Sequence, residues 1–230
     1  MTGTKVVKLK LEDEGLGKKL PNLKADPVVD HAVEVYGQRE YRDNYMEIID
    51  YHQKVLEDAR GWDVTSTQLQ EICGRIDDGY SNELKHDTKL GIFLSALMNE
   101  SNHKEFKLKV RTPLSHLGYL ASDKDITVTG DLGEAAGHCM KDGKLIVKGN
   151  TRDMAGLGLE GGEIIVEGNA GTNTARLMEG GTLHIKGNSG ILTALSMTGG
   201  ILRVEGKIKE MSDDIRGGEI WQGNKKVWPR

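Results

Sequence analysis

Apolar residues recur every 19 positions through the second half of the chain. Between the two apolar positions of each copy, the residue type varies. Alternation of this kind is typical of a β-strand with one buried face. A unit of 19 residues with short strands and no helical period predicts one coil of a solenoid, in which stacking buries apolar surface that a single unit leaves exposed. The two columns are Ile126, Leu145, Ile164, Leu183 and Leu202, and Val128, Val147, Val166, Ile185 and Val204.

Glycine follows each strand at the same step, and asparagine usually follows the glycine. We expect these residues to form a corner with a left-handed backbone, which their side chains permit most readily. A second apolar column precedes paired glycines and predicts a second buried wall and a second corner. The first corner contains Gly130, Gly149, Gly168, Gly187 and Gly206, with Asn150, Asn169 and Asn188, and the second column is Met140, Leu159, Met178 and Met197.

Atypical copies flank the regular ones, as expected for the ends of a solenoid. Upstream, Leu108 and Val110 align with the first clear strand at an offset of 18 residues, and downstream Ile215 and Ile220 belong to a shortened last coil. The sequence therefore predicts about six to seven coils over residues 106–230. One further column alternates in charge, which predicts attraction between neighbouring coils; its members are Lys148, Glu167, Lys186 and Glu205.

Before residue 106 the apolar spacing is that of amphipathic helices, apart from a short strand predicted within Met1–Leu11. The fold class is therefore α+β, with a mainly helical domain over residues 1–105 and a parallel β-helix over residues 106–230. We expect the helices to pack beside the first coil and to protect its exposed strand edge. The predicted helices are Asp26–Tyr36, Glu40–Arg60, Ser66–Ile76 and Asn82–Glu100.

Composition narrows the range of partners. The chain carries 31 basic and 35 acidic residues that are mixed along its length. It therefore lacks the basic field that would hold a nucleic acid or an anionic membrane surface. No apolar run approaches the length of a membrane span. The two cysteines, Cys73 and Cys139, form no C-x-x-C pair, which argues against a thiolate zinc site and fits a reducing, cytoplasmic compartment.

Few residues suggest chemistry. His138 and Cys139 are adjacent, but neighbours on a strand point to opposite faces, so we interpret the cysteine as structural. The candidate acid–base groups are His103, His116 and His138, near the junction of the two domains. These histidines and His184 occupy different positions in the 19-residue frame, so we do not expect them to meet on a common column. No metal or cofactor site is predicted on this chain.

Several glycine-rich phrases resemble a known family. They are GDLGEAAGHCMKDGKLIVKGN, GLGLEGGEIIVEGNAG and the ending GGEIWQGNKKVWP. They are similar to the GXGXG β-helix found in the β-helical subunit of formylmethanofuran dehydrogenase and in the C-terminal domain of the glutamate synthase large subunit. The resemblance implies a right-handed parallel β-helix without catalytic residues of its own. It also implies protein partners that carry the chemistry, with molybdopterin, tungstopterin or flavin.

Two functions remain open at this point. The first is a non-catalytic scaffold or accessory subunit of a cytoplasmic redox or one-carbon enzyme complex, which the regular repeat and the resemblance favour. The alternative is a small-molecule enzyme or binding protein, with its site where the helical domain meets the first coils. The histidines near that junction favour the alternative.

Overall fold

The computed structural model describes residues 26–38, 45–80 and 86–229. The strand predicted within Met1–Leu11 lies outside these ranges, as do the starts of two predicted helices. The helices within them are α1 (Pro27–Gln38), α2 (Tyr45–Asp58), α3 (Ser66–Tyr80) and α4 (His86–Glu100). None of the helices in the described ranges is long and apolar enough to cross a membrane.

Local sequence signals explain where α1 and α3 begin. The Asp26 carboxylate accepts a hydrogen bond from the backbone N–H of Val28 at 2.9 Å, with Pro27 as the first helical residue. At α3, Thr65 and Gln68 form a reciprocal capping box. The Gln68 N–H donates to the Thr65 hydroxyl at 3.2 Å, and the Thr65 N–H donates to Gln68 Oε1 at 2.9 Å.

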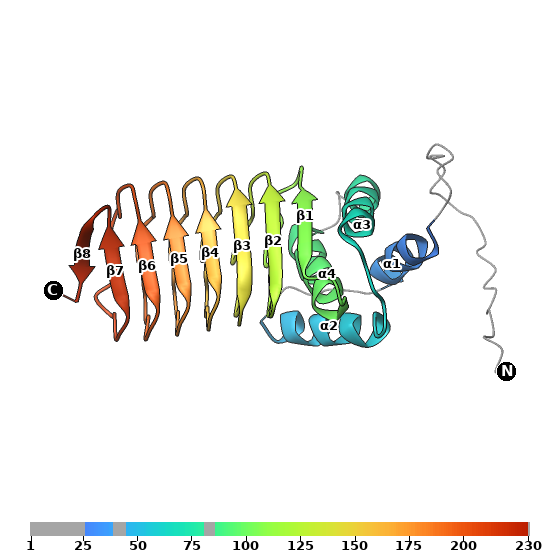
Figure 1. Ribbon diagram of the computed structural model, residues 1–230, viewed down its shortest axis with the longest axis horizontal. Coiled ribbons are helices and arrows are strands. Elements are labelled where there is room, and N and C mark those ends of the chain that lie inside the picture. Colours follow the sequence, from blue (N-terminus) through green and yellow to red (C-terminus); the bar gives the residue numbers. More distant parts are fainter. Residues whose placement is uncertain (1–25, 39–44, 81–85, 230) are drawn as a thin grey trace.

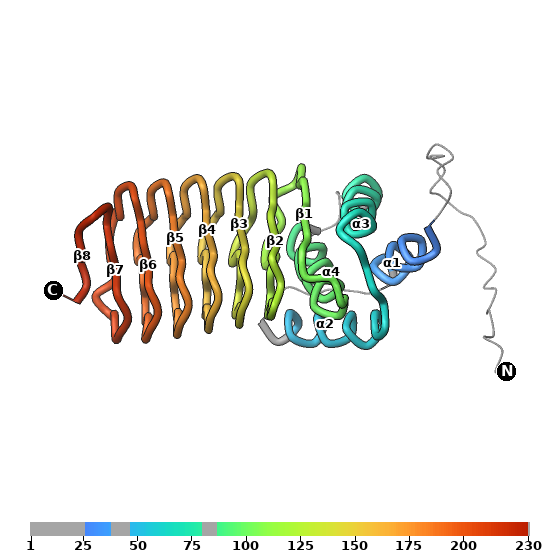
Figure 2. The backbone as a smooth tube through the Cα atoms, viewed as in Figure 1, coloured from blue at the N-terminus to red at the C-terminus, as the bar shows by residue number. Residues whose placement is uncertain are grey.

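The strands stack in chain order as a β-solenoid of about six turns (Figures 1 and 2). Each pairs in parallel with the next up to the seventh, and the last strand returns antiparallel along the seventh. The predicted solenoid is therefore confirmed. The strands are β1 (Glu105–Lys109), β2 (Lys124–Thr129), β3 (Gly143–Lys148), β4 (Glu163–Val166), β5 (Thr182–Ile185), β6 (Ile201–Val204), β7 (Glu219–Gln222) and β8 (Lys225–Trp228).

The predicted apolar columns form the core. Every member of the two strand columns, and of the methionine and leucine column opposite, has at most 1% of its surface exposed. Between β2 and β6 the pairing follows the 19-residue step. Burying these columns supplies the main stabilisation, because a fully buried aliphatic side chain contributes about 1.5 to 3 kcal/mol.

The predicted register of the first coil was wrong. Phe106 pairs with Ile126 and Leu108 with Val128, so the offset is 20 residues, not 18. The Gly118 to Gly137 step remains 19, which places the additional residue between β1 and Gly118, in the stretch that contains Pro113. Proline has no N–H to give to a strand ladder, so the chain turns there.

The corner after each strand also differs from the prediction. Gly149 and its equivalents in the next three coils are not left-handed, and neither are the asparagines that follow three of them. Glycine is required there by a close approach, because a Cβ on Gly149 would lie 2.4 Å from the Gly130 carbonyl oxygen. The asparagines form a hydrogen-bonded ladder. In it, Asn150 Oδ1 accepts from the Asn169 N–H at 2.9 Å, and Asn169 Oδ1 accepts from the Asn188 N–H at 2.8 Å.

The helices close the N-terminal end of the solenoid, as predicted (Figure 1). Two side chains of α3, one turn apart, pair with the free edge of β1. Ser66 Oγ accepts from the Lys107 N–H at 2.8 Å, and Gln70 Oε1 accepts from the Lys109 N–H at 2.6 Å. Both side chains also donate to the carbonyls of the same two residues. This pairing removes an edge on which another chain could add a strand.

Helix α4 packs in direct contact with the first coil. A Cβ on Gly91 would lie 1.9 Å from the Ser115 carbonyl oxygen, so no larger residue fits between this helix and the coil. One turn later, Ser95 Oγ accepts hydrogen bonds from the N–H groups of Gly118 and Tyr119, at 2.9 and 3.3 Å. The helical domain and the solenoid are therefore joined by matched polar contacts.

Candidate functional site

The structure brings two of the candidate histidines together. His116 Nδ1 lies 3.0 Å from His138 Nδ1, and both side chains are buried. The expectation that these histidines do not meet was therefore wrong for this pair. They are 22 residues apart, one coil and three positions, and the backbone at His116 is left-handed, with φ 58°. One ring must donate and the other accept, so the accepting imidazole is neutral.

A third histidine completes a cluster across the junction. Tyr119 lies between His138 and His52 of α2, with its ring centroid 4.9 Å from each imidazole. Asn99 of α4 donates through Nδ2 to the Tyr119 carbonyl at 3.1 Å and lies 3.4 Å from His52 Nε2. The cluster therefore links two helices to the first two coils. Its members are His52, Asn99, His116, Tyr119 and His138.

Burial disfavours the charged forms of His52 and His138. Desolvation lowers the pKa of His52 to about 4, and desolvation with repulsion from His116 lowers the pKa of His138 to about 3. A general base works best when its pKa is near the operating pH. At neutral pH, His52 and His138 are therefore neutral rings suited to packing and hydrogen bonding, and only weak bases.

The other candidates lie elsewhere. His103 is half-exposed in the turn between α4 and β1, where its Nε2 is 3.8 Å from Asp63 Oδ1. His184 lies on β5 and contacts Glu205 Oε1 at 2.8 Å. Burial raises the pKa of the Cys139 thiol, and burial raises the pKa of Cys73 to about 12, so neither is an activated nucleophile. Within the described ranges, no three His, Cys, Asp or Glu side chains are grouped to hold a metal ion.

Two exposed leucines form a feature that the sequence reasoning missed. Leu177 and Leu192 expose 47% and 39% of their surfaces, more than other large apolar side chains in the described ranges. Both residues have left-handed backbones, with φ of 56° and 53°. The signal was present in the repeat, because the column of Leu177 holds Gly158 and Ser196 in the neighbouring coils. Leu120 and Cys139 occupy the same left-handed position in earlier coils but pack against the core, so the exposure of Leu177 indicates a role for its side chain.

The leucines belong to one surface, which we call the leucine patch, composed of Leu177, Leu192 and Leu195. The Leu177 N–H donates to the Leu195 carbonyl at 2.9 Å, and the Leu195 N–H donates to the Leu192 carbonyl at 3.3 Å. Leu195 is partly buried. Two adjacent coils therefore contribute three leucines whose backbones are joined at one corner of the solenoid.

Fold and surface together define a class: a parallel β-solenoid that is closed at its N-terminal end by helices and carries an apolar patch on one corner. No family model matches the chain. No curated protein and no solved structure matches it either.

Proposed function

We propose that this chain is a non-catalytic scaffold or accessory subunit of a redox or one-carbon enzyme complex, and that the leucine patch binds a partner subunit. The glycine-rich phrases support the type of complex, and they also favour a right-handed solenoid. A single observation carries the proposal: two leucines are exposed at backbone positions that leucine does not favour.

The left-handed backbone at these leucines has a free-energy cost. A left-handed backbone costs a residue with a Cβ about 1 to 2 kcal/mol, and glycine largely avoids the cost. Asn173, the equivalent of Leu192 in the preceding coil, has φ 55° and is a residue type that tolerates this conformation. Leucine at 177 and 192 therefore carries a backbone cost without burying its side chain in the fold. A partner that covers the leucines would offset that cost.

The surroundings resemble a protein interface. Arg176 and Glu179 lie beside Leu177 in the chain and are at least partly exposed, so charged groups flank the apolar centre. Protein interfaces commonly have an apolar centre and a polar rim. A rigid solenoid also keeps the leucines of two coils in a fixed geometry, which reduces the entropy lost on binding.

Purification of the tagged full chain from its native host tests the proposal. We expect it to co-purify with an oxidoreductase subunit that contains molybdopterin, tungstopterin or flavin, identified by mass spectrometry and cofactor absorbance. The variant Leu177→Gly/Leu192→Asn copies residues of neighbouring coils. It should lose the partner without a fall in melting temperature, because both replacements suit the left-handed backbone.

A matched control places a substitution on another surface. Thr127→Glu, on the outer face of β2 and opposite Lys107 of β1, should retain the partner. A chain that purifies alone would contradict the proposal. So would an oxidoreductase that binds the leucine variant as well as the original chain.

The histidine cluster supports the alternative function through one observation. Asn99 Oδ1 is buried and has no hydrogen-bond partner among the described residues, and the same side chain contacts His52 and the Tyr119 carbonyl. A buried acceptor without a partner is costly, and a small ligand with a donor would satisfy it. Alanine substitution at His103, His116 and His138, followed by an untargeted metabolite-turnover screen, tests this alternative. It fails if the original chain turns over no metabolite or if no substitution reduces turnover.

A further inference from the structure

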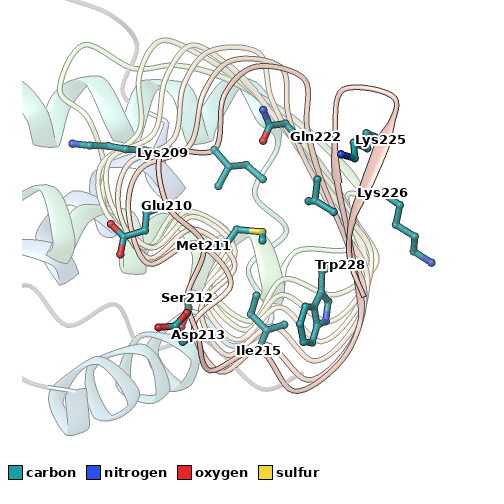
Figure 3. A pocket seen from close by; sticks show the side chains of 12 residues that line it. Lys209, Glu210, Met211, Ser212, Asp213, Ile215, Gln222, Lys225, Lys226 and Trp228 are labelled. Carbon is teal, nitrogen blue, oxygen red and sulfur yellow. The ribbon is translucent and has the colours of Figure 1, made fainter. Parts of the chain in front are cut away.

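The C-terminal end of the solenoid is open, in contrast to the N-terminal end. A groove of about 960 Å³ lies there, formed by the last coil and β8 (Figure 3). Met211, Ile215 and Trp228 form its apolar floor, and all three are only partly buried while they pack against the core. At this end, apolar residues that pack against the solenoid core are therefore partly exposed to water.

The last strand covers only one side of this end. β8 pairs with β7 and so covers the strand side of this end. The other side, which holds Met211 and Ile215, stays uncovered. At the other end, α3 and α4 satisfy the free edge of β1 and the first corner. An open apolar end is a site where another surface gains stability by docking.

Charges of opposite sign lie on opposite sides of the groove. Glu210 and Asp213 lie on one side together with Lys209, and Lys225 and Lys226 lie on the other (Figure 3). Lys226 Nζ contacts Glu219 Oε1 at 2.6 Å. Within the described ranges, Glu210, Asp213 and Lys225 take part in no ion pair. The end therefore has an acidic side, where two carboxylates outnumber Lys209, an apolar centre, and a basic side with Lys225 and Lys226.

We propose that this end binds the same end of a second copy of the chain, about a two-fold axis that crosses the groove. Such an axis places the acidic side of each copy against the basic side of the other. Each charge contact then occurs twice, as a two-fold interface requires. The same operation places the two apolar floors together and removes both from water. The homodimer is independent of the leucine patch, which lies on a corner of the solenoid.

Charge reversal on the full chain tests the homodimer. The original chain should have twice its 25.3 kDa mass by light scattering after size-exclusion chromatography. Variant A, Glu210→Lys/Asp213→Lys, makes both sides of the groove basic, and variant B, Lys225→Glu/Lys226→Glu, makes both acidic. Each variant alone should be a monomer, because like charges then face each other. An equimolar mixture should restore dimers, because both charge contacts are complementary in the A–B pair.

The controls separate assembly from folding. Variant Glu134→Lys/Glu160→Lys makes the same change in net charge as variant A on exposed positions of earlier coils, and it should remain a dimer. Far-UV circular dichroism should be the same for all variants. A monomeric original chain, or variants A and B that each remain dimers, would overturn the proposal. So would a mixture of A and B that stays monomeric.

Discussion

Mild acid should destabilise the junction between the helices and the solenoid. His52 and His138 are buried, with pKa values lowered to about 4 and about 3, against 6.5 for a solvated imidazole. Between these values and pH 6.5, the unfolded chain binds a proton at each histidine and the folded chain does not. The proton favours the unfolded state, so the free energy of unfolding falls as the pH decreases through 6.5.

The magnitude follows from the two shifts. Each proton bound only by the unfolded state changes the free energy of unfolding by about 1.4 kcal/mol per pH unit. From pH 7 to pH 5, integration yields about 2 kcal/mol for each histidine and about 4 kcal/mol for both. Solvated carboxylates remain largely ionised over this range, because their pKa values lie near 4. The histidines therefore dominate the change.

Urea unfolding monitored by far-UV circular dichroism at pH 7, 6 and 5 measures this loss. His138→Phe and His52→Phe each keep an aromatic ring and remove one titrating group. Each variant should lose about 2 kcal/mol less than the original chain over this range, whatever its stability at pH 7. His31→Gln is the control, because the His31 side chain is 58% exposed and stays in water. If the original chain and His138→Phe lose equal stability from pH 7 to pH 5, the assignment of buried neutral rings is refuted.

Three further predictions concern the fold. Gly168→Ala should lower stability by about 3 kcal/mol, because its Cβ would lie 2.4 Å from Asn150 Oδ1; Gly74→Ala, in open space on α3, should raise it by up to about 1 kcal/mol. Thermal melting distinguishes the two, and equal melting temperatures would contradict the close approach. Asn169→Ala should cost about 1 to 2 kcal/mol in urea unfolding by removing the three ladder bonds of its side chain. Asn169→Asp should cost less, since Asp131 already accepts a bond in this ladder; an alanine variant as stable as the original would argue against the ladder. Ser66→Ala/Gln70→Ala should free the β1 edge and so promote aggregation, measured as increased light scattering. The exposed control Thr67→Ala should not increase the scattering. Equal scattering from the two variants would contradict edge protection.

The strands and their core were predictable because stacked coils repeat one environment. Leu145, Ile164 and Leu183 face the same neighbours one coil apart, so a single apolar column predicts both the burial and the register. The charge column is formed only in part: Lys186 Nζ lies 3.6 Å from Glu167 Oε1, whereas Glu205 contacts His184. In a regular stack of coils, residues that are one sequence period apart contact each other.

The corners were not predictable in this way. Their path depends on left-handed residues such as Leu120, Ala135 and Met154, whose side chains do not favour that conformation. The spacing of apolar residues does not predict which residues are left-handed. The 19-residue frame therefore placed His116 and His138 on different columns and missed that the corner brings their rings together.

The ends and the corners of this solenoid face different requirements. A strand ladder leaves unpaired N–H and C=O groups at both ends, and side chains of α3 satisfy them at β1. At the far end β8 covers the sheet, but Met211 and Ile215 remain partly exposed on the other side. An end-to-end contact would cover this apolar surface and leave the corner that carries Leu177 free. One chain can then pair with its own copy at the end and bind a different partner along its side, because the two surfaces do not compete.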